Sequence, residues 1–74
     1  MNKTNEINRE IEQIVDAEPG SIRGGEALSD IGWDSMATVM FIAMVDEKFS
    51  KAIAPEGLAE AKTVADLHAL VGTI

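Results

Sequence analysis

A long run of helix-compatible residues, Ser35 to Phe49, most constrains how this chain can fold, because it is apolar on more than one face. One stripe at helical spacing carries the two phenylalanines, and another carries methionines. The first comprises Thr38, Phe41, Ile42, Val45 and Phe49, and the second Met36, Val39, Met40 and Ala43, followed by Asp46 and Glu47. A chain of 74 residues has too few other elements to surround such a helix. We therefore expect the aromatic stripe to face the core and the methionine stripe to face solvent or a partner.

The N-terminal segment has the pattern of an amphipathic helix from Thr4 to about Val15. Thr4 is the expected N-cap, and Glu12 is expected among the charged residues on the outer faces. A Pro-Gly pair that cannot continue a helix follows, so we expect the helix to end near Ala17 or Glu18. Its apolar positions are Ile7, Ile11, Ile14 and Val15.

A long glycine-containing loop, Pro19 to Trp33, connects these two segments. Three apolar residues within it, Ile22, Leu28 and Ile31, are expected to fold back onto the core. A loop of this length in so small a domain is usually functional.

The C-terminal part predicts one short helix and one longer helix. Glu56 to Ala61 is expected to form a short helical turn, weakened by Gly57. Thr63 to Asp66 resembles a capping box that opens the last helix, and Gly72 closes it. The buried stripe of that helix is Val64, Leu67, Leu70 and Val71. No segment alternates for long at the strand period, so we expect one all-α domain over residues 1–74. Its expected form is a small antiparallel helical bundle of three main helices plus a short fourth, with a long first loop.

Thirteen acidic and six basic residues give a net charge of −7, which repels phosphate backbones and anionic membrane surfaces. Nucleic acid is therefore not an expected partner. The absence of cysteine excludes disulfides and thiolate metal sites. The chain shows no signal-peptide pattern, and its apolar runs are too short to span a bilayer. We expect a cytoplasmic monomer without a membrane span.

Ser35 directly follows the carboxylate of Asp34 at the point where the loop becomes a helix. This places its side chain in the first helical turn, where we expect it to be exposed. The unpaired N–H groups and partial positive charge of a helix start would favour a phosphodiester on Ser35 by about 0.3–1 kcal/mol. Ser35 is thus a candidate attachment site, although the Asp-Ser pair taken alone also fits an ordinary helix cap.

The run Leu28-x-x-Ile31-Gly32-x-Asp34-Ser35-Met36 resembles the signature of the acyl carrier proteins and their peptidyl-carrier relatives. The resemblance extends over about Ile7 to Val71, since the helices, loop and capping signals follow the family's order. It implies an acyl-carrier-like bundle in which Ser35 is esterified by phosphopantetheine. The group would come from coenzyme A through a phosphopantetheinyl transferase, also called holo-acyl-carrier-protein synthase, which uses magnesium.

The resemblance also implies that the protein is a carrier and not an enzyme. Acyl intermediates would be held as thioesters on the arm and presented to an acyl-loading ligase and to acyl-processing or acyl-transfer enzymes. Asp34 would help position the synthase's metal and coenzyme A, and Met36 would pack on the synthase and on client enzymes. Asp46 and Glu47 match acidic positions that dock on basic side chains. The partner-binding face is therefore expected to comprise Met36, Val39, Met40, Asp46 and Glu47.

Three positions of the second helix depart from the carriers of general fatty acid synthesis. Ala37, Met40 and Lys48 stand where those carriers are commonly acidic, so the face is less acidic and more apolar. This favours service to a dedicated pathway with its own loading enzyme. Trp33 is a large neighbour for the serine; we expect it to cap the core, the alternative being contact with the arm or a partner.

Other functions fit the residues less well. A nucleophilic-serine enzyme is disfavoured because the sole histidine, His68, has no evident orienting carboxylate and is expected at the surface or its boundary. The carboxylates lack calcium-loop spacing, and a solvated face explains them better; they are Asp30, Asp34, Asp46 and Glu47. No metal site is expected. Met44 fits core packing and exposure equally, whereas Met40 fits exposure better. An aminoacyl or peptidyl carrier and an unmodified acidic helical adaptor remain as alternatives.

Overall fold

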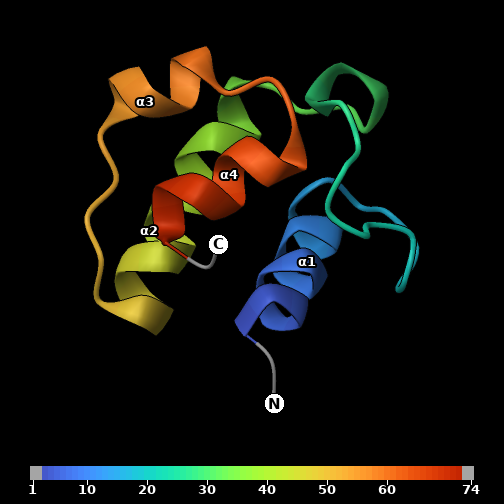
Figure 1. Cartoon of the computed structure of the whole chain (residues 1–74), viewed down its shortest axis with the longest axis horizontal. Coiled ribbons are helices and arrows are strands. Elements are labelled where there is room, and N and C mark those ends of the chain that lie inside the picture. The colour runs from blue at the N-terminus through green and yellow to red at the C-terminus, as the bar shows by residue number, and fades with distance from the viewer. Residues whose placement is uncertain (1–2, 73–74) are drawn as a thin grey trace.

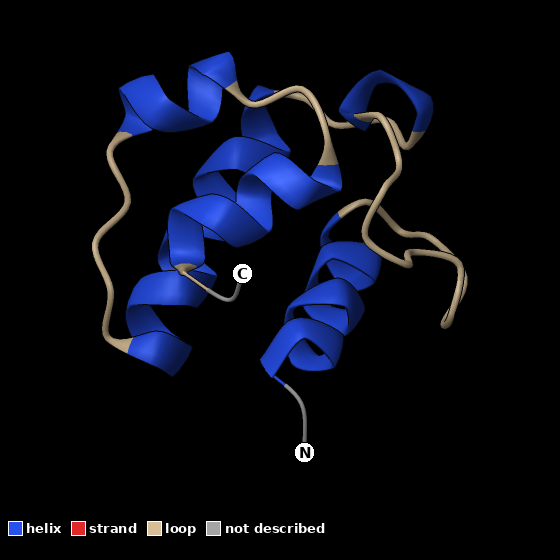
Figure 2. Ribbon diagram, in the orientation of Figure 1, coloured by secondary structure: helices blue, strands red, loops and turns tan. Residues whose placement is uncertain are grey.

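A computed structural model describes residues 3–72, which form four α-helices joined by loops (Figures 1 and 2). The helices are α1 (Lys3–Ile14), α2 (Ser35–Phe49), α3 (Pro55–Glu60) and α4 (Val64–Val71), and a 3₁₀ turn, η1 (Leu28–Asp30), interrupts the first loop. In Figure 1, α1 and α2 run in opposite directions and α3 crosses the end of the bundle at which α2 begins. The predicted all-α bundle with a short additional helix and a long first loop is confirmed.

The core lies between the inner faces of all four helices and is completed by the first loop. Ile22 and Leu28 of that loop are buried, and Ile31 packs against the core, as predicted. The buried apolar residues are Ile7, Ile11, Ile22, Leu28, Ala37, Phe41, Met44, Val45, Ile53, Leu58, Val64, Leu67 and Val71. The loop is thus anchored to the bundle through its own side chains.

Helix α1 differs from the prediction at both ends. Lys3 is already helical, so Thr4 lies inside α1 and is not its N-cap. The regular helix ends at Ile14 because Asp16 adopts a left-handed conformation with φ of 58°. The Ala17 N–H then donates to Glu12 O and the Asp16 N–H to Gln13 O, the bond pattern of a Schellman motif. An aspartate, rather than the Pro-Gly pair, terminates the helix.

Helix α2 has the predicted bounds and the predicted division into two faces. Phe41 and Val45 are fully buried, and Met44 lies with them in the core. The helix ends at Phe49, and its C-cap, Ser50, has a left-handed backbone and donates its N–H to Asp46 O. The aromatic stripe therefore faces inward, and Met44 belongs to the core.

The short helix α3 begins with Pro55, which suits the first helical turn because it has no N–H to satisfy. A Cβ atom on Gly57 would lie 3.0 Å from Leu70 Cδ2 of α4. Glycine, which weakens the short helix, therefore also allows α3 to pack closely on α4.

Helix α4 opens with the predicted capping box. Thr63 Oγ1 accepts from the Asp66 N–H, and the Asp66 carboxylate accepts from the Thr63 and Lys62 N–H groups. The hydrogen bonds from these two N–H groups lower the pKa of Asp66, and the bond from Lys62 has the larger effect. Gly72 ends the helix with φ of 89°, as predicted.

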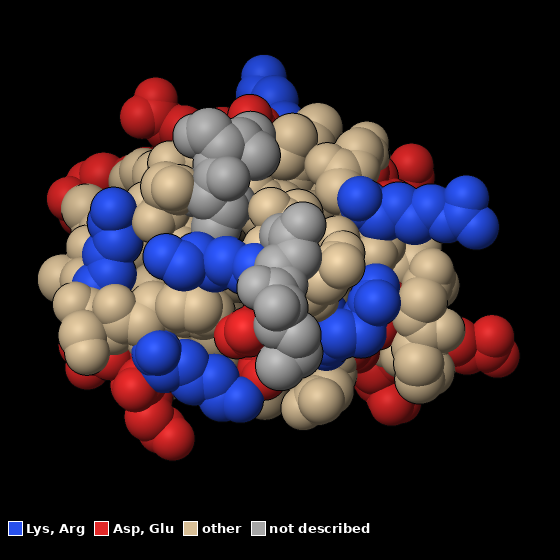
Figure 3. Space-filling view, turned by 60° about the horizontal axis from the view of Figure 1, so that its bottom comes forward, with Lys and Arg blue, Asp and Glu red and all other residues tan. Residues whose placement is uncertain are grey.

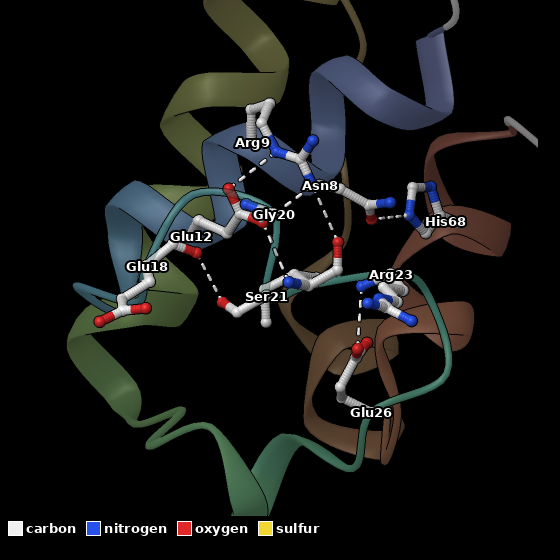
Figure 4. Close-up of polar contacts among 10 residues, drawn as sticks. Asn8, Arg9, Glu12, Glu18, Gly20, Ser21, Arg23, Glu26 and His68 are labelled. Carbon is white, nitrogen blue, oxygen red and sulfur yellow. Dashed lines mark hydrogen bonds and ion pairs between the residues drawn. The ribbon is translucent and has the colours of Figure 1, made fainter.

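The prediction for His68 was wrong, because its side chain is only 2% exposed. A hydrogen bond of 2.7 Å joins His68 Nε2 to Asn8 Oδ1, and Asn8 is buried as well (Figure 4). The side-chain amide of Asn8 in α1 gives the imidazole a hydrogen-bond partner inside the core, so the burial of His68 leaves this ring nitrogen satisfied. Burial also lowers the pKa of His68 from 6.5.

The end of the molecule at which α1 begins and α2 ends mixes charges of both signs. Figure 3 shows basic and acidic side chains interspersed over this face, with uncharged residues between them. Lys48 forms an ion pair with Glu10 that links α2 to α1, and Lys3 Nζ lies 5.7 Å from the centre of the Phe49 ring. The excess negative charge is therefore not concentrated on this face.

Candidate attachment site at the start of α2

The loop that leads to Ser35 is fastened to α1 by one buried carboxylate (Figure 4). Glu12 Oε2 accepts hydrogen bonds of 2.9 Å from both the Gly20 and Ile22 N–H groups. Arg9 donates to both carboxylate oxygens at 2.7 and 2.8 Å, and also to Ile22 O at 2.9 Å. The first part of the loop is thus held by side chains that lie one turn apart on α1.

Glu12 is 2% exposed, so the prediction that it lies on an outer face was wrong. Burial alone would raise its pKa, but the hydrogen bonds from the Ile22 N–H, Arg9 and the Gly20 N–H outweigh this effect. The pKa of Glu12 is consequently held below 4.5, and the side chain is a carboxylate at neutral pH. The charge of Glu12 is compatible with a core position of α1 because the loop supplies hydrogen-bond donors to it, the N–H groups of Gly20 and Ile22.

The second part of the loop is held against the start of α4. Ala27 and Thr63 form an isolated antiparallel bridge, in which the Leu28 N–H donates to Lys62 O and the Val64 N–H to Glu26 O, both at 2.9 Å. After η1, Gly32 turns the chain with φ of 77°, a conformation that favours glycine. The backbone then enters α2 from a fixed position.

Asp34 is the N-cap of α2, and Ser35 is the first residue of the helix. The Asp34 carboxylate accepts from the Ala37 N–H at 2.8 Å, while its carbonyl accepts from the Thr38 N–H at 3.1 Å. Within residues 3–72 the N–H groups of Ser35 and Met36 have no acceptor, and the Ser35 side chain is exposed. The geometry therefore offers a free hydroxyl beside unpaired donors at a helix start.

Trp33, two residues before Ser35, is partly buried and closes the core. Its ring meets Phe41 edge-on, with centroids 5.7 Å apart and an angle of 70°. Its Nε1–H donates to Thr38 Oγ1 at 3.0 Å. These contacts agree with the prediction that Trp33 caps the core, and they fix the indole on the flank of α2.

The methionine stripe of α2 is exposed, as predicted. Met36 is 65% exposed, Val39 62% and Met40 44%, and these three are the large apolar residues that the described chain leaves in solvent. Asp46 and Glu47 are also exposed and follow on the same side of the helix. The structure thus brings Ser35 and the predicted partner-binding residues together on one surface.

A shallow hollow of about 290 Å³ lies between α3 and α4. Its walls are Gly57, Glu60, Ala61, Asp66, Ala69 and Leu70. Since it is open and carries two carboxylates, it does not resemble a closed apolar channel for an acyl chain.

The surroundings of Ser35 contain no catalytic arrangement among the described residues. His68 is buried on α4 and bonded to Asn8, so it is not a base for an exposed serine. No group of three potential metal-ligating side chains occurs within residues 3–72. In the same range no helix has both the length and the apolar character needed to cross a bilayer.

Sequence reasoning missed the three buried polar residues, Asn8, Glu12 and His68. It placed Arg9 correctly on an outer face but missed its contact with the loop. The pattern contained one usable signal: Asn8 and Glu12 are one turn apart and lie beside the apolar positions Ile7 and Ile11 of α1. Their burial depends on partners in the loop and in α4, which periodicity cannot reveal.

Comparison with known proteins gives the family. Residues 5–71 match the family described as phosphopantetheine attachment site, which covers most of the chain. A solved structure assigned as an acyl carrier protein from Mycobacterium tuberculosis superposes with a TM-score of 0.78. The two chains are 30% identical over 92% of this chain and 93% of that one. Among curated proteins no match was found.

The chain therefore belongs to the phosphopantetheine-attachment family and has the acyl carrier protein fold. Membership in this family indicates a carrier protein with a covalently attached phosphopantetheine group. It also implies interaction with a phosphopantetheinyl transferase and with acyl-processing enzymes. The exposed Ser35 hydroxyl, with free N–H donors beside it, fits such a group.

Proposed function

We propose that Ser35 carries the phosphopantetheine group and that the protein is a cytoplasmic, monomeric acyl carrier of a dedicated biosynthetic pathway. One observation carries this proposal: the Ser35 hydroxyl is exposed at the first position of α2, while the adjacent Asp34 caps the helix. When bound, the group supplies a flexible thiol that holds cargo as a thioester.

Each residue at the start of α2 has a distinct role in this proposal. Asp34 fixes the backbone of the first turn and adds a carboxylate beside the hydroxyl, suited to a transferase's metal ion. The N–H groups of Ser35 and Met36 offer hydrogen bonds to the phosphodiester, worth about 0.3–1 kcal/mol together with the helix dipole. Gly32 turns the chain shortly before α2, and the Ser35 side chain that follows is exposed.

The exposed stripe of α2 is the proposed docking surface for the transferase, the loading ligase and the acyl-transfer enzymes. Met36, Val39 and Met40 would bury apolar area on these partners, and Asp46 and Glu47 would pair with basic residues. The carrier would then act as a cosubstrate of other enzymes, and residues 1–74 would form one carrier domain.

Intact-mass measurement tests the attachment. Wild-type protein incubated with coenzyme A, magnesium and a broad-specificity phosphopantetheinyl transferase should gain one phosphopantetheine. Ser35→Ala should gain none, while Ser29→Ala, which removes another exposed serine from the same loop region, should be modified like wild type. Absence of modification in folded wild-type protein would favour the unmodified adaptor instead.

A second assay tests the dedicated pathway. Of the three predicted departures, Ala37 is buried and so does not belong to this surface, contrary to the prediction, whereas Met40 and Lys48 are exposed. These two stand at positions where carriers of general fatty acid synthesis are commonly acidic, so a basic partner surface gains little from them. We expect slow malonyl transfer to the holo-protein by a general malonyl transacylase, and faster transfer to Met40→Glu. Efficient transfer to wild type that Met40→Glu does not improve would contradict the specialised role.

A further inference from the structure

The docking surface of α2 carries two exposed methionines in consecutive turns. Met36 is 65% exposed and Met40 44%, and Val39 lies between them. Met44, one further turn along the same helix, is only 9% exposed and belongs to the core. The same side chain therefore occurs in two environments on a single helix.

Oxidation of a methionine changes it from an apolar into a polar residue. The thioether sulfur attacks one oxygen of hydrogen peroxide, so an S–O bond forms as the O–O bond breaks. The sulfur is oxidised by two electrons to the sulfoxide, and the second oxygen leaves as water after taking up the proton of the first. The reaction needs peroxide to reach the sulfur, which the exposure of Met36 and Met40 permits.

We propose that Met36 and Met40 form an oxidation-sensitive pair through which peroxide weakens the docking of partner enzymes beside Ser35. This inference rests on the proposed function. In the free protein the two sulfoxides remain in water, so they cost the fold little. In a docked complex the same groups would have to lose water on an apolar contact surface, which opposes binding.

The location of the pair determines which property responds. Because Met36 adjoins Ser35 in the sequence, every enzyme that reaches the Ser35 hydroxyl approaches this side chain. Because Met44 is packed in the core, its oxidation would instead require opening of the bundle and would destabilise it. Oxidation confined to the exposed pair should therefore impair docking and leave the fold intact.

Peptide mass mapping tests the first half of the proposal. Full-length apo-protein is treated with hydrogen peroxide, the peroxide is removed with catalase, and sulfoxide formation is followed at each methionine. We expect Met36 and Met40 to oxidise at least tenfold faster than Met44, with unchanged circular dichroism and melting temperature. Equal rates at Met44, or loss of structure as the exposed pair reacts, would overturn the inference.

The rate of phosphopantetheine transfer tests the second half. Oxidised apo-protein should show a kcat/KM at least tenfold lower than untreated protein, which corresponds to about 1.4 kcal/mol. Treatment with methionine sulfoxide reductases should restore it. Unchanged transfer to protein that is fully oxidised at Met36 and Met40 would refute the proposal.

The double variant Met36→Leu/Met40→Leu is the matched control, because leucine keeps the apolar volume but cannot be oxidised. The variant is compared with itself: its own rate of phosphopantetheine transfer, measured before and after peroxide treatment, should be the same. Sensitivity that persists in this variant would assign the effect to another residue and overturn the proposal. Failure of untreated wild type to be modified would instead contradict attachment at Ser35, so the two failures are distinguishable.

Discussion

Replacing Glu12 with glutamine tests whether one buried carboxylate holds the first loop. Glutamine keeps the shape of the side chain but has one acceptor oxygen and an NH₂ group. With its oxygen at the Oε2 position it can still accept from Gly20 and Ile22, but its NH₂ then faces the Nε–H of Arg9, which donates at 2.7 Å in the wild type. One hydrogen bond is lost outright, and the others lose their charge assistance.

The expected cost follows from these contacts. Removing one partner of a buried ion pair typically costs about 3–5 kcal/mol. The Arg9 side chain is 44% exposed, so water can solvate part of its charge, and we expect a loss of about 2–3 kcal/mol in the free energy of unfolding. Domains of this size have about 4–11 kcal/mol in total. The substitution should therefore remove a large fraction of the stability.

Urea unfolding followed by Trp33 fluorescence measures the change, since this sole tryptophan packs on Phe41 in the folded state. Glu10→Gln is the matched control: it is the same substitution on the same helix, in a pair with the half-exposed Lys48, and should cost less than about 1 kcal/mol. Equal losses for Glu12→Gln and Glu10→Gln would refute the role of Glu12 as a loop anchor.

The pH dependence gives an independent check on Glu12. Its folded-state pKa lies below 4.5, so the unfolded chain binds the proton more readily. The stability that the carboxylate contributes is thus fully present above pH 4.5 and is lost as the pH falls through the folded-state pKa. The difference between wild type and Glu12→Gln should shrink over this range; a difference independent of pH would contradict the assigned charge.

Three further predictions concern the core, the turn before α2 and the buried histidine. Phe41→Ala should lower the free energy of unfolding by about 3–5 kcal/mol and leave much of the protein unfolded, whereas Val39→Ala on the outer stripe should change it by less than about 0.5 kcal/mol in urea titrations. Similar losses for the two would mean that the faces are exchanged. Gly32→Ala should lower the melting temperature through a strain of about 1 kcal/mol at φ of 77°, while Gly25→Ala, which has ordinary φ and open space, should not. Because burial lowers the pKa of His68 below 6.5, its contribution to stability is present above that pH and lost as the pH falls through the folded-state value. An NMR titration that places the pKa of the His68 ring at or above 6.5 would disprove this.

The fold was largely predictable because its elements are encoded locally. The bounds of α2, the Thr63–Asp66 capping box and the two faces of α2 follow from periodicity and cap residues that lie within a few positions of one another. The end of α1 was missed because it depends on the left-handed backbone of Asp16, which nothing in the residue pattern demands. Propensity identified the helix but not the turn that stops it.

The candidate site was predictable for the same reason, whereas its supports were not. Asp34 and Ser35 are adjacent in the sequence, and Asp34 caps the helix through the N–H groups of Ala37 and Thr38, which follow within the same turn. The hydrogen bonds that Glu12 accepts from Gly20 and Ile22, and the one between Asn8 and His68, join residues 8, 10 and 60 positions apart. From the sequence alone, a charged or polar side chain is predicted to be exposed, because its tertiary hydrogen-bond partner is not known. This explains the wrong predictions for Glu12 and His68.

The attachment proposal and the stability of the fold are separable because the Ser35 hydroxyl is not used to hold the helix. Asp34 caps α2 through its side chain and carbonyl, and no hydrogen bond described within residues 3–72 uses the hydroxyl of Ser35. Esterification there removes no interaction that stabilises the folded state, and the helix dipole favours the added phosphate. A carrier must be loaded, unloaded and recognised by several enzymes without changing its fold. A hydroxyl that makes no stabilising contact within the described residues meets that requirement.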